Sequence, residues 1–380
     1  MPHLAVTQLQ LTNFRNYEQH TLTATDGPVV ITGPNGAGKT NILEAISLLT
    51  PGRGIRNSKL TLLDRQGPAA SSNPFSNFPW SIFSHIRTPE GNITIGTGRD
   101  PSPKKDKRIV KINGETARGQ TQLAHHFAVC ALTPQMDTIF IDGSTSRRNF
   151  LDRLVVNFYP DHVRHLSIYN HAKMERSKLL SAPPWDEIWI SHIEQRMAEQ
   201  AIAIAAARID TLQHLQTTIL THHSAFPKAE LTATGGVEQL LTTMPALEAE
   251  SNYCELLKKS RHNDKQTGRT EHGPHRSDFH VVHEHTRLPA ELCSTGEQKA
   301  IMITLTLATA RAREKWFGSA PVMLLDEVTS HLDDHKRLSF FDELSTFSAQ
   351  IWMTDTNPEI FLQLPSKPLF LTIEKTCISG

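Results

Sequence analysis

Residues 33–40 read Gly33-Pro34-Asn35-Gly36-Ala37-Gly38-Lys39-Thr40, and this G-x-x-x-x-G-K-[ST] segment decides the fold of the chain. It follows the apolar run Val29-Val30-Ile31, which predicts a buried strand, and a helix is predicted to begin at Lys39. Glycines in this context let backbone N–H groups approach phosphate oxygens, and the helix N-terminus faces the same anion. We expect Lys39 to reach the β- and γ-phosphates and the Thr40 hydroxyl to ligate Mg²⁺. The segment therefore predicts a nucleoside triphosphate site.

A second apolar run ends in two carboxylates, in the segment Val322-Met323-Leu324-Leu325-Asp326-Glu327. Four apolar residues predict a buried strand, and ligands of parallel sheets collect at the carboxyl edge where these two acids lie. We expect Asp326 to hold Mg²⁺ through water and Glu327 to polarise the water that attacks the γ-phosphate. With the phosphate loop upstream, this pair indicates a nucleotide hydrolase.

Composition limits the classes of function. The length of 380 residues favours two or three units. Lysine and arginine number 39, as do aspartate and glutamate, so any nucleic-acid surface must be a local patch. The four cysteines lack C-x-x-C spacing, the N-terminus does not resemble a signal peptide, and we find no apolar run of membrane-spanning length. We therefore expect a cytoplasmic protein with reduced thiols and no membrane span.

Hydrophobic periodicity predicts two lobes. The chain alternates as strands up to about Pro134 and then becomes helical, and the polar stretch 262–277 is expected to lead back to the first lobe. A strand at 278–283 is expected to join the α/β layer. We predict an α/β P-loop NTPase lobe made of residues 1–133 and 263–380, with a helical lobe of residues 134–262 inserted into it. Helices of the inserted lobe are predicted at 144–157, 161–181, 186–222 and 237–260.

The segment Ser294-Thr295-Gly296-Glu297-Gln298 precedes another predicted helix. Taken alone it is a helix start, with Ser294 as N-cap and Glu297 completing a capping box. Upstream of the acidic pair, however, S-x-G-E-Q resembles the signature motif of ABC-type ATPases. In that superfamily the signature of one subunit contacts the γ-phosphate bound to the other. The resemblance therefore implies an ATP-dependent homodimer, with Ser294 on the partner's nucleotide and Asp333 in the D-loop.

One departure from transporter-type ABC ATPases concerns the switch histidine. The expected strand Gln350-Ile351-Trp352-Met353 is followed by Thr354-Asp355-Thr356, without a histidine. Either Thr354 or Asp355 could contact the γ-phosphate, and otherwise hydrolysis should be slow.

Further motifs narrow the resemblance. The segment Leu9-x-Leu11-x-Asn13-Phe14-Arg15-Asn16-Tyr17 is similar to the opening of DNA-repair ATPases related to SMC proteins. Three later segments resemble blocks of the RecF family of bacterial recombination mediators, and the inserted lobe is too short for a long coiled-coil arm. The three segments are Ala131-Leu132-Thr133-Pro134, Arg147-Arg148-Asn149-Phe150-Leu151-Asp152 and Gly273-Pro274-His275-Arg276-Ser277-Asp278.

The resemblance implies a cytoplasmic DNA-repair protein that dimerises on ATP and binds duplex DNA, especially at single-strand gaps. Such a protein would act with RecO and RecR to load RecA during repair and the SOS response, and slow ATP hydrolysis would reset the clamp. The implied nucleotide residues are Gly33, Pro34, Asn35, Gly36, Ala37, Gly38, Lys39, Thr40, Ser294 and Asp326, with Glu327 and Lys39 catalytic and with Thr40 and Asp326 on magnesium.

Several alternatives stay open. Arg15 could contact nucleotide or DNA or be a plain surface arginine, and Gln135 lies near the place of a Q-loop. Arg147 and Arg148 could touch DNA or pair with Asp142 or Asp152, and a basic hairpin tip around residues 104–108 could grip phosphates or be solvated. The alternative function is an ABC-type ATPase that serves a transporter or another protein partner without direct DNA binding.

Overall fold

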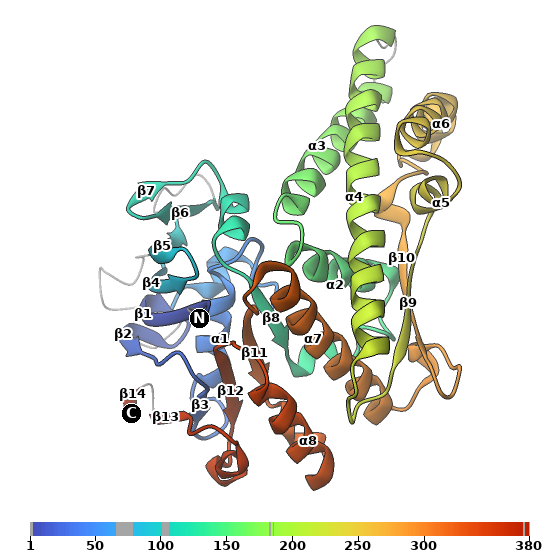
Figure 1. Cartoon of the computed structure of the whole chain (residues 1–380). Coiled ribbons are helices and arrows are strands. Elements are labelled where there is room, and N and C mark those ends of the chain that lie inside the picture. Colours follow the sequence, from blue (N-terminus) through green and yellow to red (C-terminus); the bar gives the residue numbers. More distant parts are fainter. Residues whose placement is uncertain are drawn as a thin grey trace. The chain divides into compact units, whose positions relative to one another are not determined.

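The computed structural model describes residues 3–65, 79–100, 106–181, 184, 186–374 and 377–379. The chain splits into two compact units (Figure 1). Unit 1 comprises Met1–Asp137, His223–Phe226 and Met302–Gly380, and unit 2 comprises Thr138–His222 and Pro227–Ile301. Among the residues that are described, no helix combines the length and the apolar character needed to cross a bilayer.

A six-stranded sheet carries the two nucleotide-binding motifs of unit 1. Its order is β14-β13-β3-β12-β11-β8, and all neighbouring strands except β14 run parallel. Every residue of β3, β11 and β12 is buried, as expected for near-continuous apolar runs in a parallel sheet. Strand β12 lies between β3, which leads into the phosphate loop, and β11, which leads into the acidic pair. The two motifs therefore lie at the same edge of the sheet, separated by one strand. The strands are β3 (Val29–Thr32), β8 (Val129–Leu132), β11 (Val322–Asp326), β12 (Ile351–Asp355), β13 (Leu369–Glu374) and β14 (Cys377–Ser379).

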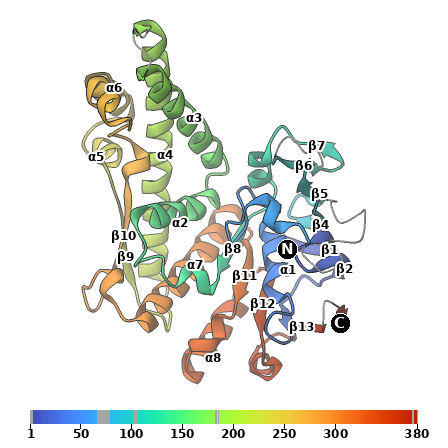
Figure 2. The same cartoon turned by 180° about the vertical axis from the view of Figure 1, so that it is seen from behind.

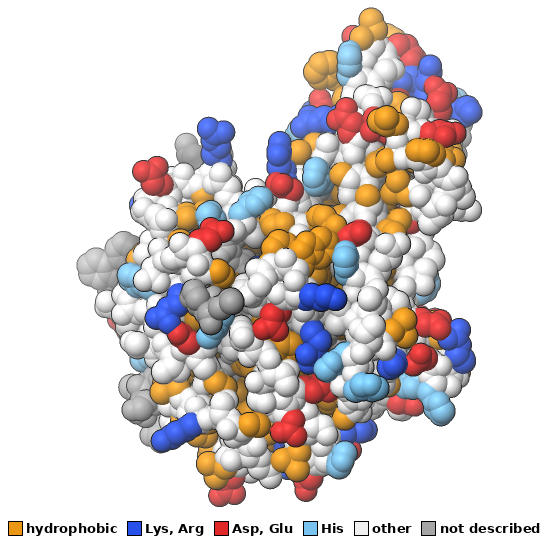
Figure 3. Space-filling model, viewed as in Figure 1, with side chains coloured by type: hydrophobic (Ala, Val, Ile, Leu, Met, Phe, Trp, Pro, Cys, Tyr) orange, Lys and Arg blue, Asp and Glu red, His pale blue; other side chains and the backbone are white. Residues whose placement is uncertain are grey.

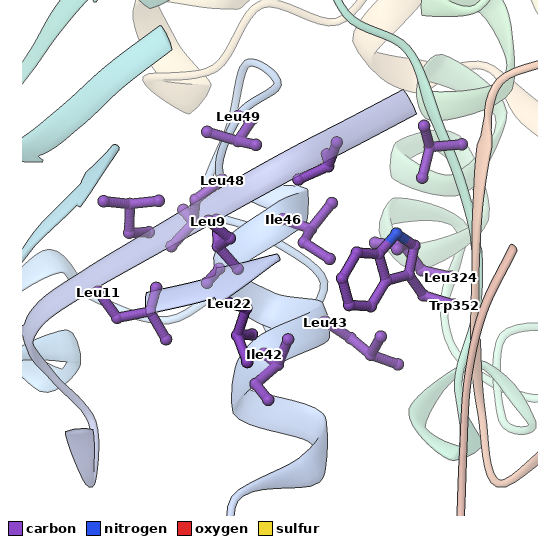
Figure 4. Packing of buried hydrophobic residues seen from close by; sticks show 14 of the residues in the cluster. Leu9, Leu11, Leu22, Ile42, Leu43, Ile46, Leu48, Leu49, Leu324 and Trp352 are labelled. Carbon is purple, nitrogen blue, oxygen red and sulfur yellow. The ribbon is translucent and has the colours of Figure 1, made fainter. Parts of the chain in front are cut away.

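A second, antiparallel sheet of unit 1 has the order β2-β1-β4-β5-β6-β7. Helix α1 (Lys39–Ser47) contributes Ile42, Leu43 and Ile46 to a core that it shares with residues of both sheets (Figure 4). Trp352 of β12 is fully buried in this core. The strands are β1 (Ala5–Phe14), β2 (Tyr17–Thr23), β4 (Ser81–Thr88), β5 (Gly91–Arg99), β6 (Arg108–Ile112) and β7 (Glu115–Thr116).

The remaining helices of unit 1 lie between its strands along the chain. Helix α7 (Thr295–Phe317) begins in unit 2, and its residues from Met302 onward belong to unit 1. Helix α8 spans Asp334–Ser345. Helix α8 begins where the Asp333 carboxylate accepts a hydrogen bond from the backbone N–H of Lys336, which is N-cap geometry. The short 3₁₀ segments are η1 (Leu60–Leu63), η3 (Gln120–His125), η4 (Pro134–Met136), η7 (Val328–His331) and η8 (Pro358–Gln363).

Unit 2 is built around the 35-residue helix α4 (Glu187–Thr221), whose N-cap Asp186 accepts from two backbone N–H groups. Its alanine-rich middle, with Ala198, Ala201 and Ala205 fully buried, allows close packing of the neighbouring helices. A two-stranded antiparallel sheet runs beside α4, as the view from behind shows (Figure 2). The other elements are α2 (Ser144–Val156), α3 (His162–Leu180), β9 (Ala229–Thr234), α5 (Gly236–Thr243), α6 (Ala246–Thr267), η5 (Pro274–Arg276), β10 (Asp278–His283) and η6 (Ala290–Leu292).

The structure differs from the sequence-based lobe boundaries. Residues 263–301, predicted within the NTPase lobe, lie in unit 2. The reason is that β10 pairs with β9, from Asp278 opposite Thr234 to His283 opposite Ala229, and does not join the parallel sheet. The single helix predicted at 237–260 is two helices, because Pro245 lacks a backbone N–H and stands at the N-cap of α6.

The predicted basic hairpin tip also differs in part. Lys104 and Lys105 lie outside the described residues, so the phosphate-gripping alternative is not tested for them. Arg108 is not at an exposed tip, because its guanidinium donates to the carbonyls of Thr50 (3.3 Å) and Gly52 (2.8 Å). On the face of the molecule in Figure 3, positive and negative side chains are interspersed, in keeping with a net charge of zero.

Candidate nucleotide-binding site

The loop between β3 and α1 has the backbone that a phosphate loop needs. Gly33, Gly36 and Gly38 have φ values of 146°, 79° and 113°, a region that residues with a Cβ rarely adopt. A Cβ on Gly33 would lie 2.4 Å from the carbonyl oxygen of Ile373, and one on Gly38 would lie 2.3 Å from Asn16 Nδ2. Glycine is therefore required at both positions by conformation and by space.

Lys39 lies inside this loop with 4% of its surface exposed. Its Nζ donates to the carbonyl oxygens of Gly33 at 2.8 Å and Pro34 at 3.2 Å, which satisfies a buried ammonium group. Pro34 and Asn35 are exposed, whereas Ala37 is buried against the core. The ammonium is thus held at the loop by backbone carbonyls and not by a carboxylate.

The acidic strand end meets the start of α1 at this loop. The Thr40 hydroxyl donates to Asp326 Oδ1 at 3.0 Å, and the Thr354 hydroxyl donates to the same oxygen at 2.6 Å. The structure therefore brings together the two residues that the sequence predicts on magnesium. A hydroxyl and a carboxylate are oxygen ligands of the kind that Mg²⁺ prefers, so these side chains fit the ion.

Glu327, directly after β11, has a φ of 50°, which is rare for a residue other than glycine. Its backbone N–H donates to the carbonyl oxygen of Thr354 at 3.2 Å. Asp355 accepts from the Thr329 hydroxyl at 2.5 Å and from the backbone N–H groups of the two residues that follow it. Strained backbone of this kind is concentrated at functional sites, and here it directs the chain after β11 away from the strand.

The turn between β1 and β2 supports the phosphate loop, a contact that no sequence motif predicted. Asn16 Nδ2 donates to the carbonyl oxygen of Ala37 at 2.9 Å, and the Tyr17 hydroxyl donates to that of Gly38 at 3.2 Å. Asn41 of α1 donates in turn to Asn16 Oδ1 at 2.7 Å. An asparagine in a tight turn is the only local signal, and the distance along the chain to residue 37 hides its target.

Arg15 of the same turn is not a plain surface arginine. Its guanidinium binds Glu44 of α1 through two hydrogen bonds of 2.8 and 2.7 Å, and it also donates to Ser58. Glu44 is fully buried, and Arg56 Nη1 lies 3.5 Å from its Oε2, which also accepts from Arg15 Nε. The pair fixes α1 behind the loop.

Ser294 and Gln135, whose roles were predicted from the resemblance to ABC-type ATPases, lie at a helix start and in a 3₁₀ segment. Ser294 and Glu297 form the predicted capping box, with hydrogen bonds from Ser294 N to Glu297 Oε2 (2.8 Å) and from Glu297 N to Ser294 Oγ (3.4 Å). Ser294 belongs to unit 2 and the phosphate loop to unit 1, so its contact with nucleotide stays a prediction. Gln135 is exposed in η4, and its role likewise stays a prediction.

Solved structures share this fold over the whole chain. The structure of the recombination mediator protein RecF-ATP in the RecFOR pathway superposes with a TM-score of 0.83 at 22% identity, covering all of this chain and 99% of that one. The Smc head domain from Pyrococcus furiosus, bound to the C-terminal domain of ScpA, gives 0.53 at 15% identity, covering 100% of this chain and 96% of that one. The predicted fold class, an ABC-type P-loop ATPase head with a further lobe, is confirmed.

Comparison with protein families and curated relatives confirms the predicted resemblance. The model of the RecF/RecN/SMC N terminal domain matches residues 5–377. The DNA replication and repair protein RecF of Rhizobium rhizogenes is 41% identical over 98% of both chains. That of Mesorhizobium japonicum is 39% identical over 97% of this chain and 96% of its own. The chain therefore belongs to the RecF family.

Proposed function

We propose that this protein is an ATP-dependent DNA-binding protein of replication and recombinational repair, which hydrolyses ATP slowly. The observation that carries the ATPase part is the convergence of Lys39, Thr40, Asp326 and Glu327 at the carboxyl edge of the parallel sheet. The names of the curated relatives support the role in DNA replication and repair. The solved relative that binds ATP is described as a recombination mediator of the RecFOR pathway.

In the proposed reaction the loop and its lysine bind the phosphates of ATP. Lys39 exchanges the carbonyls of Gly33 and Pro34 for phosphate oxygens, while backbone N–H groups at the start of α1 donate to the same anion. Thr40 and Asp326 would hold Mg²⁺, which neutralises charge on the phosphates when bound. Glu327 accepts the proton of the attacking water as general base.

Slow turnover is proposed from the last two residues of β12. The position of a switch histidine is occupied by Thr354 and Asp355, which are buried and hydrogen-bonded to Asp326 and Thr329. Neither side chain carries a positive charge that could stabilise the γ-phosphate in the transition state. A slowly hydrolysing ATPase suits a clamp that stays closed on DNA until ATP is cleaved.

The clamp itself is proposed to be a cytoplasmic homodimer closed by ATP. Ser294 lies exposed at the N-terminal end of α7, where a hydroxyl and the helix dipole can bind the partner's γ-phosphate. Asp333 would lie near the same interface. We propose duplex DNA and single-strand gaps as the target, and RecR, RecO and RecA as the proteins that act with the clamp.

The test is binding of a labelled duplex by the Glu327→Gln protein, with Mg·ATP and without nucleotide, at two salt concentrations. The variant should bind ATP without cleaving it, so binding should occur only with ATP and weaken steeply with salt, because phosphate contacts release counterions. Lys39→Met is the control and should not bind DNA under either condition. If the Glu327→Gln protein binds ATP but no DNA, the ATPase serves a transporter or another protein partner.

A further inference from the structure

Three basic side chains of unit 2 converge on the loop 273–277 without a carboxylate partner. Arg148 of α2 donates from Nη1 to the carbonyl oxygen of Ser277 at 2.7 Å. Arg276, in the same loop, donates to the carbonyl oxygen of Glu271 at 3.3 Å. Lys173 of α3 lies over the ring of Tyr169, with its Nζ 5.9 Å from the ring centre. We name Arg148, Lys173 and Arg276 the basic triad.

The loop on which the triad converges is held by close contacts. Gly273 has a φ of 141°, and a Cβ there would lie 2.0 Å from the hydroxyl of Tyr169 and 2.6 Å from that of Tyr253. The Tyr169 hydroxyl bonds His275 Nδ1 at 2.8 Å, and His275 Nε2 bonds the carbonyl oxygen of Thr270 at 3.0 Å. The residue before Arg276 is thereby bonded to the tyrosine over which Lys173 lies.

Nearby acidic groups are already neutralised by other cations. Asp278 accepts two hydrogen bonds from Arg147, at 2.8 and 2.7 Å. Asp152 accepts from Arg208 at 2.9 and 3.0 Å. Among the residues that the structure describes, no carboxylate lies within ion-pair distance of any member of the triad. Arg147 therefore forms an ion pair, but with Asp278 and not with Asp142 or Asp152 as predicted, and Arg148 forms none with a described residue.

Electrostatics agree with this geometry. Burial, together with the charges of Arg148 and Arg276, lowers the pKa of Lys173. Burial, together with the nearby charge of Lys173, lowers the pKa of His275 to about 4, so this ring is neutral at pH 7 and does not add to the cluster. Like charges held close together on fixed supports favour an anion, because its binding relieves their repulsion.

We propose that the basic triad contacts the phosphate backbone of DNA. The chain as a whole is uncharged, so a DNA surface has to be a local excess of positive charge, and the triad is such an excess. Guanidinium and ammonium groups bind phosphate oxygens without reading bases, which suits a protein that recognises duplex structure. This inference rests on the proposed function and gives it a surface.

The test compares two double variants that each remove two charges from unit 2. Lys173→Gln with Arg276→Gln leaves Arg148 in place, because Arg148 also supports the loop through Ser277. The matched control is Lys258→Gln with Lys259→Gln, two exposed lysines of α6. Both are made in the Glu327→Gln background, and duplex affinity is measured with Mg·ATP across a series of salt concentrations.

The triad variant should bind duplex roughly tenfold more weakly, and the slope of log affinity against log salt should fall by about 2, since each lost phosphate contact removes about 0.9. The control should keep the parent affinity and slope, and ATP binding should be unchanged in both. Equal affinity and slope for the triad variant and its parent would overturn the inference. Failure of the parent itself to bind duplex would overturn the proposed function instead. If the parent binds duplex but the triad variant and the control lose affinity equally, the loss reflects the overall charge of the protein, and the triad is not a DNA-binding site.

Discussion

The interiors of the two units are stabilised in different ways. In unit 1 the strands that position the nucleotide loop are mostly apolar and buried, and the buried carboxylate of Glu44 pairs with two partly exposed arginines. In unit 2 fully buried arginines cross-link the helices. Arg176 binds Glu194 at 2.9 Å and Asp264 at 2.6 Å, which joins α3 to α4 and α6.

This difference shows what each unit requires of its core. Apolar packing contributes stability without demanding one exact partner for each group, whereas a buried ion pair tolerates only the arrangement that satisfies all of its donors and acceptors. Burial opposes ionisation of Asp152, but the charge of Arg208 and the hydrogen bond from His162 outweigh it and lower its pKa to about 2. The ion pairs of unit 2 therefore act mainly by specifying which helices meet, and in which register.

Removing one partner of a buried pair should produce the largest effect. Arg176→Met leaves the buried Asp264 without a cation and Glu194 with Arg261 alone, and we expect unit 2 to lose about 3–5 kcal/mol of stability. Hydrogen exchange measured by mass spectrometry should show faster exchange in α3, α4 and α6, with β3 and β11 unchanged. Arg164→Met, an exposed position on the same helix, is the control and should have little effect. Equal loosening of β3 would contradict the separation of the two cores.

The same difference explains how much the sequence could predict. The α/β unit follows from local patterns, because a buried strand, a glycine loop and a helix start are adjacent between residues 29 and 47. The assignment of β10 to the parallel sheet was wrong, since its partner β9 forms a separate sheet through contacts that periodicity does not encode. The hydrogen bond from Asn16 to Ala37 was also missed, because a side-chain contact to a distant backbone leaves no pattern.

A half-buried histidine, His275, should make the stability of unit 2 depend on pH. Because the pKa of His275 falls from 6.5 to about 4 on folding, the unfolded chain binds more protons between these values. The contribution of His275 to the free energy of unfolding is therefore fully present above pH 6.5. It is lost as the pH falls towards 4, by an amount on the order of 3 kcal/mol. The loss for Asp152 belongs to a lower window, between 3.8 and about 2.

Denaturant titrations of the wild type and of His275→Gln at pH 7, 5.5 and 4 measure this effect. The difference in the free energy of unfolding between the two proteins should shrink as the pH falls, because only the wild type carries the His275 ring with its lowered pKa. His280→Gln, at an exposed position of β10, should keep a constant difference from the wild type. A constant difference for His275→Gln as well would show that the ring is not held neutral in the folded protein.

Removing one polar contact from unit 1 should have a smaller effect, because polar contacts there support the nucleotide loop more than the core. Asn16→Ala removes hydrogen bonds to Ala37 and Asn41, and each net hydrogen bond contributes about 1 kcal/mol. ATP affinity should therefore fall about fivefold while the melting temperature changes little. Gln19→Ala, exposed on β2, should bind ATP as the wild type does. A fall in melting temperature with unchanged ATP affinity would mean that Asn16 stabilises the fold of unit 1. The two units of the protein would then use polar groups in the same way.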